Sequence, residues 1–371
     1  MRVGLKALVF VIGALLMLAP AIVAGMMFTD AMQRRAETAN AARLRVLGDI
    51  AANQLGRQMY RLWQDVEGMS RIADMGDSEE TRRQLTLLSS VDRRYTWIGV
   101  ADVTGKVIAA SQGMLEGASV AERPWFRRGL NGPAATDVHG ALLLEKLLPA
   151  TPEPRRFVDF SAPIKSAQAG TTGVIGAHFD WALVKDGLHA FRGQGVDLLL
   201  VSRDRAVLSG PAALEGTTLS VGSAVAAGQG ASVSLRERWS DGRDYMTVVV
   251  PVVWKDMPGF GWSVIVRADT NTVLNPIRSI ARAFWTLLGA GVLVGLVLLY
   301  LFSAWLAKPL QRLVAAAEAL ASGRSDQPPH DETRYEEATR LSAALVRLQT
   351  HSVRPYQPTR TKADKTSISM P

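Results

Sequence analysis

An unbroken run without charged side chains, Ala283–Ala307, constrains this chain more than any other feature. It is bounded by Arg282 and Lys308 and reads AFWTLLGAGVLVGLVLLYLFSAWLA. About 20 apolar residues cross a bilayer as a helix, because a helix satisfies its own backbone hydrogen bonds in lipid. The run therefore predicts a transmembrane helix at 283–307. Within it, Gly291 and Gly295 have the spacing that lets two membrane helices approach closely.

A second apolar run, Ala7–Thr29, follows the positively charged residues Arg2 and Lys6. It exceeds the roughly 7–15 apolar residues of a secretory signal, so we expect an uncleaved transmembrane helix at 7–29. The small residues at 21–25 leave cleavage open as the alternative. Lys and Arg concentrate on the cytoplasmic side of membrane helices, which places residues 1–6 and the segment after 307 in the cytoplasm. Residues 30–282 are then expected on the outer side.

Composition narrows the partners further. Lys and Arg number 42 against 34 Asp and Glu, a formal net charge of +8. An excess of basic over acidic residues can indicate nucleic-acid binding, but the sequence has no compact Lys/Arg patch interleaved with aromatic residues. We therefore expect the cations to face anionic lipid beside the membrane helices, and we expect no nucleic-acid partner. The chain has no cysteine, which excludes disulfides and thiolate sites and is compatible with a periplasm.

The segment between the two apolar runs changes its hydrophobic period near Tyr95. From Asp30 to about Ser90 apolar residues recur at helical spacing without a proline, which predicts one long helix. The chain then shows β-rich runs on either side of Asp102–Gly105, a turn with glycine where φ is positive. A short helix is expected at 121–130, and 141–148 is either strand or helix. Further strands are expected at 156–164, 173–184, 231–239, 244–254 and 261–269, and a strand–turn–strand unit is expected at 196–210.

This order of elements, with a weaker second copy of the strand–turn–strand pattern, resembles the double Cache sensor domain of bacterial transmembrane receptors. The resemblance covers residues 30–275. It rests on the long first helix, YTWIGVADVTGKVIAAS, Arg123-Pro-Trp-Phe126, RFVDFSAPI and GVIGAHFDWALV. It implies an α+β fold with two tandem PAS-like Cache modules in a periplasmic domain at 30–282. The distal module would occupy about 90–190 and the proximal module about 191–275, in a protein of the bacterial inner membrane.

The resemblance also implies a ligand pocket in the distal module, with Arg123 and Trp125 on its wall. In the amino-acid-sensing subset of the family, Arg-x-Trp-Tyr and a later aspartate hold the ligand. This sequence departs from that pattern, because Phe126 replaces the tyrosine and His178 stands where the aspartate would fall.

The side chain of Arg123 allows two interpretations. A guanidinium can hold a carboxylate through two parallel hydrogen bonds, with Trp97 or Trp125 as an apolar wall. The alternative is a structural salt bridge at the start of a helix, with Glu122 or Asp159 as the partner.

Two Asp/His pairs, Asp137-x-His139 and His178-x-Asp180, have the spacing that places both side chains on one face of a strand. They predict either a divalent metal ion held by two His and two Asp or hydrogen bonds to an organic ligand. We favour the organic ligand, and therefore expect neither a metal nor a cofactor. The predicted ligand-binding residues are Trp97, Arg123, Trp125, Phe126, Asp137, His139, Asp159, His178 and Asp180.

After the second apolar run, apolar residues repeat at spacings of three and four on both sides of a polar connector. This pattern resembles a HAMP relay domain at 304–350, although Ser325 stands where the family connector has an apolar residue. The resemblance implies a parallel helical bundle with a second copy, and hence a homodimer. The polar residues 351–371 are expected to be a disordered tail. The predicted relay residues are Gly291, Gly295, Pro309, Gly323 and Glu337.

Together these features predict a transmembrane receptor that binds a small extracytoplasmic ligand. We expect the signal to pass through the second membrane helix and the HAMP domain to a separate output protein, since no output domain follows. No His-Glu-x-x-His, Gly-x-Ser-x-Gly or phosphate-loop motif is present, so we do not expect an enzyme. Two alternatives stay open: a membrane-anchored scaffold that binds a protein partner, and a tethered periplasmic enzyme of unrecognised type.

Overall fold

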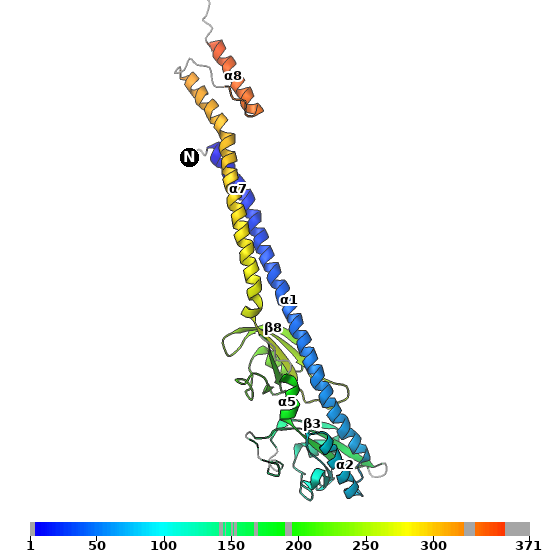
Figure 1. Cartoon of the computed structure of the whole chain (residues 1–371). Helices are drawn as coiled ribbons and strands as arrows, with labels where there is room; N and C mark the ends of the chain where they lie inside the picture. The colour runs from blue at the N-terminus through cyan, green and yellow to red at the C-terminus, as the bar shows by residue number, and fades with distance from the viewer. Residues whose placement is uncertain are drawn as a thin grey trace, which may run out of the picture. The chain divides into compact units, whose positions relative to one another are not determined.

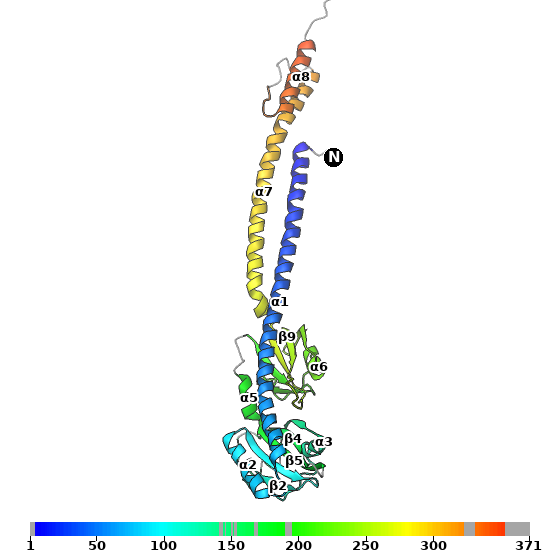
Figure 2. The same cartoon turned by 90° about the vertical axis from the view of Figure 1, so that its right-hand side faces the viewer.

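A computed structural model of the chain describes residues 4–140, 144, 146–149, 151, 154–166, 170–189, 195–322 and 331–352 (Figures 1 and 2). The chain divides into two compact units. One unit, Ala31–Ser279, contains both β-sheets. The other combines Met1–Asp30 with Ile280–Pro371, and its regular elements among the described residues are helices.

Two helices precede the first strand, α1 (Leu5–Ile72) and α2 (Ser78–Val91). The prediction of one helix from Asp30 to about Ser90 is therefore wrong. The first helix ends at Ile72, and Asp77 is the N-cap residue of the second. The carboxylate of Asp77 accepts a hydrogen bond from the backbone N–H of Glu80 at 3.0 Å. An Asp at the N-cap followed three residues later by Glu is typical of a helix start, and the sequence carries this signal.

The buried face of α1 explains why the helix is so long. Leu55, Met59, Leu62 and Val66 recur at spacings of three and four, and at most 1% of each residue is exposed. They belong to a core that also contains apolar residues of both sheets. Within the unit Ala31–Ser279, α1 thus supplies one continuous apolar stripe to both modules.

The first module is an antiparallel sheet in the order β2-β1-β5-β4-β3, with α2 and α3 packed on it (Figure 2). Its hairpin turns at Gly105, where φ is +87° and an added Cβ would lie 2.7 Å from the backbone of Ala121. The predicted glycine turn is thereby confirmed. The strands and helices of this module are β1 (Tyr95–Asp102), β2 (Val107–Ala110), η1 (Ser111–Gly113), α3 (Pro124–Asn131), β3 (Ala134–His139), β4 (Phe157–Ser166), β5 (Gly170–Asp180) and α5 (Trp181–His189).

The predicted strand at 173–184 is correct only as far as Asp180. The carboxylate of Asp180 accepts a hydrogen bond from the backbone N–H of Ala182 at 2.9 Å, and α5 begins at Trp181. An aspartate side chain that accepts a hydrogen bond from the backbone N–H two residues later is common at helix starts. The segment 141–148, which the sequence left open, lies partly outside the described residues.

The second module repeats this plan in the order β7-β6-β10-β9-β8. The sequence prediction of two α+β modules built to one plan is therefore confirmed. A turn at Gly242, with φ +78°, joins β8 and β9 of this sheet. Its elements are β6 (Asp197–Val201), β7 (Val207–Ser209), α6 (Gly222–Gly228), β8 (Val233–Arg238), β9 (Asp244–Pro251) and β10 (Ser263–Asp269).

Aromatic side chains join the two modules directly. The rings of Phe260 and Trp262 are stacked with centroids 4.2 Å apart, and Phe160 of β4 lies 5.1 Å from Phe260. Trp181, the first residue of α5, meets Trp262 edge-on at 5.5 Å. In addition, Trp262 Nε1 donates a hydrogen bond of 2.7 Å to the carboxylate of Asp137.

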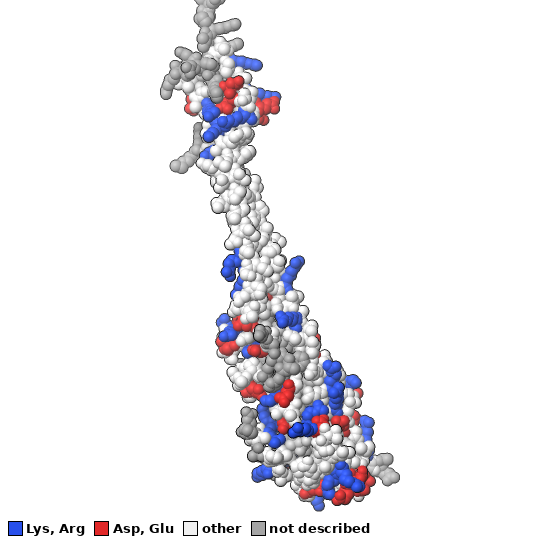
Figure 3. All heavy atoms as spheres, in the orientation of Figure 1, with Lys and Arg blue, Asp and Glu red and all other residues white. Residues whose placement is uncertain are grey.

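In the helical unit, segments of α1 and of α7 (Thr270–Ala321) are long and apolar enough to cross a membrane. Figure 3 shows a stretch of this helical pair without charged side chains on the visible face. The rings of Phe28 and Phe284 stack with centroids 4.4 Å apart. A Cβ added at Gly295 would lie 2.6 Å from Met17 Sδ, whereas none of the described atoms would meet one at Gly291.

The last described helix, α8 (Glu336–Ser352), is preceded by a segment that contacts α7. Tyr335 Oη donates to the backbone oxygen of Leu306 at 3.1 Å, and Arg312 pairs with Glu332 at 3.1 Å. Of the predicted relay residues, Pro309 lies inside α7 and Glu337 in the first turn of α8, whereas Gly323 lies outside the described residues.

Candidate ligand-binding site

A pocket of about 220 Å³ opens in the first module between α3 and the sheet. Pockets for drug-sized molecules measure roughly 300–1,000 Å³, so this one suits a smaller ligand. Five of the nine predicted ligand-binding residues line it. The lining residues are Trp97, Leu115, Val120, Arg123, Pro124, Trp125, His139, Gly140, Leu144 and His178.

Two tryptophans form the rigid wall of the pocket. Trp97 is fully buried in β1, and its indole N–H donates to the backbone oxygen of Met114 at 3.0 Å. The backbone oxygen of Trp125 accepts the hydroxyl of Ser161 at 2.8 Å, which ties α3 to β4. The two indole centroids are 5.8 Å apart. Gly176 of β5 makes room for the second ring, since a Cβ there would lie 2.4 Å from ring carbons of Trp125.

Arg123 is placed at the pocket by the start of α3. It is the N-cap residue, with Pro124 next in a position where proline favours helix initiation. Its predicted structural partners are engaged elsewhere: Glu122 pairs with Arg127, and Asp159 contacts two histidines. Within the described part of the chain the guanidinium has no ion-pair partner. The half-buried guanidinium of Arg123 thus lines the pocket, where its N–H groups can donate hydrogen bonds to a ligand.

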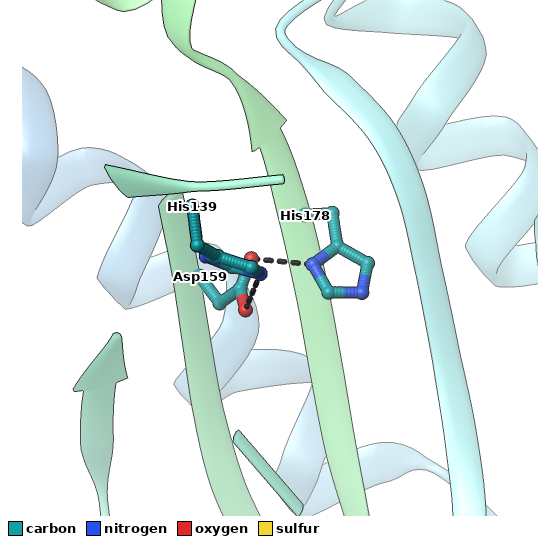
Figure 4. A group of neighbouring side chains, drawn as sticks. All are labelled: His139, Asp159 and His178. Atoms are coloured by element: carbon teal, nitrogen blue, oxygen red, sulfur yellow. Dashed lines mark hydrogen bonds and ion pairs between the residues drawn. The ribbon is translucent and has the colours of Figure 1, made fainter. Parts of the chain in front are cut away.

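Two histidines that line the pocket, His139 and His178, flank a buried carboxylate (Figure 4). Asp159 of β4 is fully buried, and it pairs in register with His178 of β5, so their side chains are cross-strand neighbours. Asp159 Oδ1 is hydrogen-bonded to His178 Nδ1, and Oδ2 lies 3.2 Å from His139 Nε2. Figure 4 shows His139 and His178 approaching the carboxylate from different strands.

Three predicted ligand-binding residues lie away from the pocket. Phe126 is buried in the core, edge-on to Trp125. Asp180 pairs with Arg155 at 3.3 Å. Asp137 accepts the hydrogen bond from Trp262, and burial raises the pKa of its carboxyl although that bond acts in the opposite direction.

The interpretation that each Asp/His pair faces one site is therefore wrong. Asp137 and His139 are two residues apart on β3, but the pairing of this strand with β4 slips between Thr136 and His139. Such an irregularity breaks the alternation of side chains along a strand. His139 reaches the pocket, while Asp137 turns to the second module.

Sequence reasoning did not identify the apolar lining residues Leu115, Val120 and Leu144. Leu115 lies in an irregular segment with φ +64°, and Leu144 lies in the stretch whose structure the sequence left open. Neither belongs to a periodic pattern, so no sequence signal marks them.

A larger cavity of about 400 Å³ lies in the second module beside Trp254, Phe260 and Gly261. Arg203 is the single ionisable residue among those that the structure describes along its wall. Specific small-molecule sites combine apolar walls with a few converging polar groups. The pocket of the first module has this combination and is the stronger candidate.

The sequence from residue 29 to residue 277 matches the Cache domain family. The chain therefore belongs to the Cache domain family. A search among curated proteins finds no match. The match ends before the predicted HAMP segment, so HAMP stays a prediction.

Solved structures of the same fold include chemoreceptor domains. The ligand-binding domain of the Pseudomonas fluorescens chemoreceptor CtaA, in complex with L-leucine, is 17% identical with a TM-score of 0.50, over 66% of this chain and 99% of that one. Methyl-accepting chemotaxis protein X is 15% identical with a TM-score of 0.50, over 63% and 99%. At such identities the likeness concerns the fold.

Proposed function

We propose that this chain is a membrane receptor whose Cache domain binds a small carboxylate-bearing ligand in the pocket of the first module. The observation that carries the proposal is Arg123, which faces the pocket without an ion-pair partner among the described residues. A guanidinium matches the planar geometry of a carboxylate, and Trp97 and Trp125 supply apolar surface beside it.

The ligand would have to be small. A pocket of about 220 Å³ has room for a compact organic acid or amino acid, and amino acids are reasonable first probes because the CtaA structure holds L-leucine. The departures at Phe126 and His178 argue for testing non-amino-acid carboxylates beside them.

Binding would be transmitted to the second module through β3. This strand carries His139, which lines the pocket, and Asp137, which contacts Trp262 of the second module. Since the two residues are two positions apart, a movement of His139 would also move Asp137. Trp262 also stacks on Phe260 and precedes β10, which runs directly into α7. A shift of β3 on ligand binding would therefore change the packing next to the strand that leads out of the sheet.

The proposal places the protein in the bacterial inner membrane with two membrane spans. The Cache domain would be periplasmic and both termini cytoplasmic, since Lys6 and Lys308 flank the apolar runs. The spans would be 7–29 and 283–307.

The relay would be a HAMP bundle formed with a second copy of the chain. Leu341 and Leu348, seven residues apart on α8, are 43% and 67% exposed, as expected for an apolar stripe that another helix covers. A change in the packing of α7 and α8 would be read by a separate output protein. Bundles that switch between two packings amplify small displacements.

Thermal unfolding of the purified full chain, followed by tryptophan fluorescence, tests the proposal. From a panel of carboxylates, amino acids, amines and purines, we expect at least one carboxylate or amino acid to raise the unfolding midpoint, and we expect amines and purines without a carboxylate to leave it unchanged. A ligand at 100 times its Kd adds about 2.7 kcal/mol, which corresponds to about 5–10 °C for a domain of this size.

Arg123 at the N-cap of α3 and Arg127 within α3 provide the matched comparison. Arg123→Ala should abolish the ligand-induced shift, whereas Arg127→Ala, whose partner is the surface residue Glu122, should retain it. An equal shift in both variants would place the ligand elsewhere. Stabilisation only by a protein partner would favour the scaffold alternative, and turnover of the compound would favour the enzyme.

A further inference from the structure

We propose that His139, Asp159 and His178 bind one divalent transition-metal ion, with Zn²⁺ as the representative, on the wall of the pocket (Figure 4). Each residue offers a ligand atom, and these atoms lie within 4.8 Å of one another. The three side chains come from adjacent strands β3, β4 and β5, whose ladder fixes their relative positions.

The hydrogen bonds around His139 argue for a cation at this position. His139 Nδ1 lies 3.0 Å from the backbone oxygen of Asp137, which can only accept, so Nδ1 carries the hydrogen. The Nε2 of a neutral ring then presents a lone pair, and it points at Asp159 Oδ2 from 3.2 Å. Two lone pairs at this distance repel each other unless a metal ion or a proton lies between them.

Asp159 Oδ2 needs such a partner for a second reason. It is buried and lacks a hydrogen-bond partner within the described structure. An ionised carboxylate oxygen in this situation is costly, because burial removes its hydration without replacement. A metal ion bound to Oδ2 and to His139 Nε2 would offset that cost.

One pair of ligand atoms already has the spacing of a zinc site. Zn²⁺ binds imidazole nitrogen and carboxylate oxygen at about 2.0–2.2 Å, which separates two tetrahedral ligand atoms by about 3.3 Å. The distance between His139 Nε2 and Asp159 Oδ2 is 3.2 Å. His178 is hydrogen-bonded to the same carboxylate, and its ligand atom lies within 4.8 Å of the other two, so a change of its side-chain rotamer would complete the set. The hydrogen bond from His139 Nδ1 to a backbone oxygen is the usual support of a metal-binding histidine.

Three protein ligands leave a coordination position for an exogenous group. Both histidines line the pocket, so that position faces the space in which a ligand would lie. The set differs from the four residues considered from the sequence, because Asp137 and Asp180 have other partners and Asp159 takes their place. This inference depends on the pocket wall alone and not on carboxylate binding at Arg123.

Titration of the full chain with the metal alone tests the inference. The protein is purified in detergent through a tag without histidine, stripped with EDTA, and titrated with Co²⁺, with visible absorption as the readout and Zn²⁺ as competitor. We expect saturation at one ion per chain and displacement by Zn²⁺. The zinc-loaded protein should show nitrogen and oxygen ligands at about 2.0–2.2 Å by X-ray absorption.

Variants assign the ion to the cluster. His139→Gln and His178→Gln should each weaken Co²⁺ binding by more than about 100-fold, since loss of a supporting residue costs about 10–100-fold. His139→Gln is the safer variant for folding, since its side chain is 33% exposed. Asp180→Asn, a carboxylate outside the pocket, is the control and should bind as the wild type does.

Two results would overturn the inference. One is saturable binding that both histidine variants retain, because the ion would then lie on other side chains. The other is failure to saturate near one ion per chain, which would leave a proton as the bridge between His139 and Asp159. No organic ligand takes part, so neither result bears on the test at Arg123.

Discussion

Replacing Gly176 by alanine should destabilise the Cache domain and narrow its pocket. The added Cβ would lie 2.4 Å from ring carbons of Trp125, whereas carbon atoms in contact normally lie about 3.5–4.0 Å apart. The ring must therefore move by about 1 Å or more. Trp97 and Phe126 contact the same ring, so the open space into which it can move is the pocket.

The expected magnitude follows from the cost of overpacking. Inserting extra methyl groups into a packed core typically costs about 1–3 kcal/mol. For a domain of this size each kcal/mol lowers the unfolding midpoint by about 2–4 °C, so we expect a decrease of about 2–12 °C. The affinity for the pocket ligand should fall as well.

Thermal unfolding of the full chain by tryptophan fluorescence measures the effect. Gly68→Ala is the control, and we expect it to change the unfolding midpoint in the opposite direction. Gly68 lies in α1, and a Cβ added there would have none of the described neighbouring atoms within 4 Å. Alanine is favoured over glycine in helices by about 0.5–1 kcal/mol, so this midpoint should rise. A midpoint for Gly176→Ala equal to or above that of the wild type would refute the packing of Trp125 against β5.

Three further results are expected. Trp262→Phe removes the hydrogen bond to Asp137 but keeps an aromatic ring, so ligand affinity should be retained. In a Leu348→Cys background, whose cysteine is the single one in the chain, Trp262→Phe should abolish ligand-dependent cross-linking. Unchanged cross-linking would exclude β3 as the route. Hydrogen bonding from Arg82 lowers the pKa of Glu116, so this carboxylate stabilises the fold at neutral pH and the stabilisation disappears as the pH falls through its lowered pKa. The midpoints of wild type and Glu116→Gln should therefore differ most near pH 7 and converge in acid, and a constant gap would contradict the ion pair. Leu55→Ala should cost about 2–5 kcal/mol as a buried residue of α1, measured by the same unfolding assay, and a loss within error would contradict its 1% exposure.

Most strands could be predicted from the sequence because their signals are local, although β3 (Ala134–His139) was not among them. Alternation of apolar residues and glycine turns such as Gly105 and Gly242 mark the strands, and the two copies of one pattern indicate two modules. The break between α1 and α2 has a local signal too, the cap at Asp77, but the helical period on both sides obscures it.

The site could be predicted only in part. Arg123 and Trp125 were identified by resemblance, and the structure places both at the pocket. The contact of Asp159 with His139 and His178 depends on how three strands are paired, which one sequence does not reveal. The register of the pairing between β3 and β4 shifts between Thr136 and His139, and Asp137 contacts Trp262 of the second module instead of the pocket.

Isothermal titration of the full chain with the best stabilising carboxylate tests the central claim most directly. Truncating one partner of a buried, hydrogen-bonded charge pair costs about 2–5 kcal/mol, which corresponds to about a 30-fold or greater increase in Kd. We expect this increase for Arg123→Ala and a wild-type Kd for Arg127→Ala. Equal Kd values for wild type and Arg123→Ala would contradict the account of the pocket.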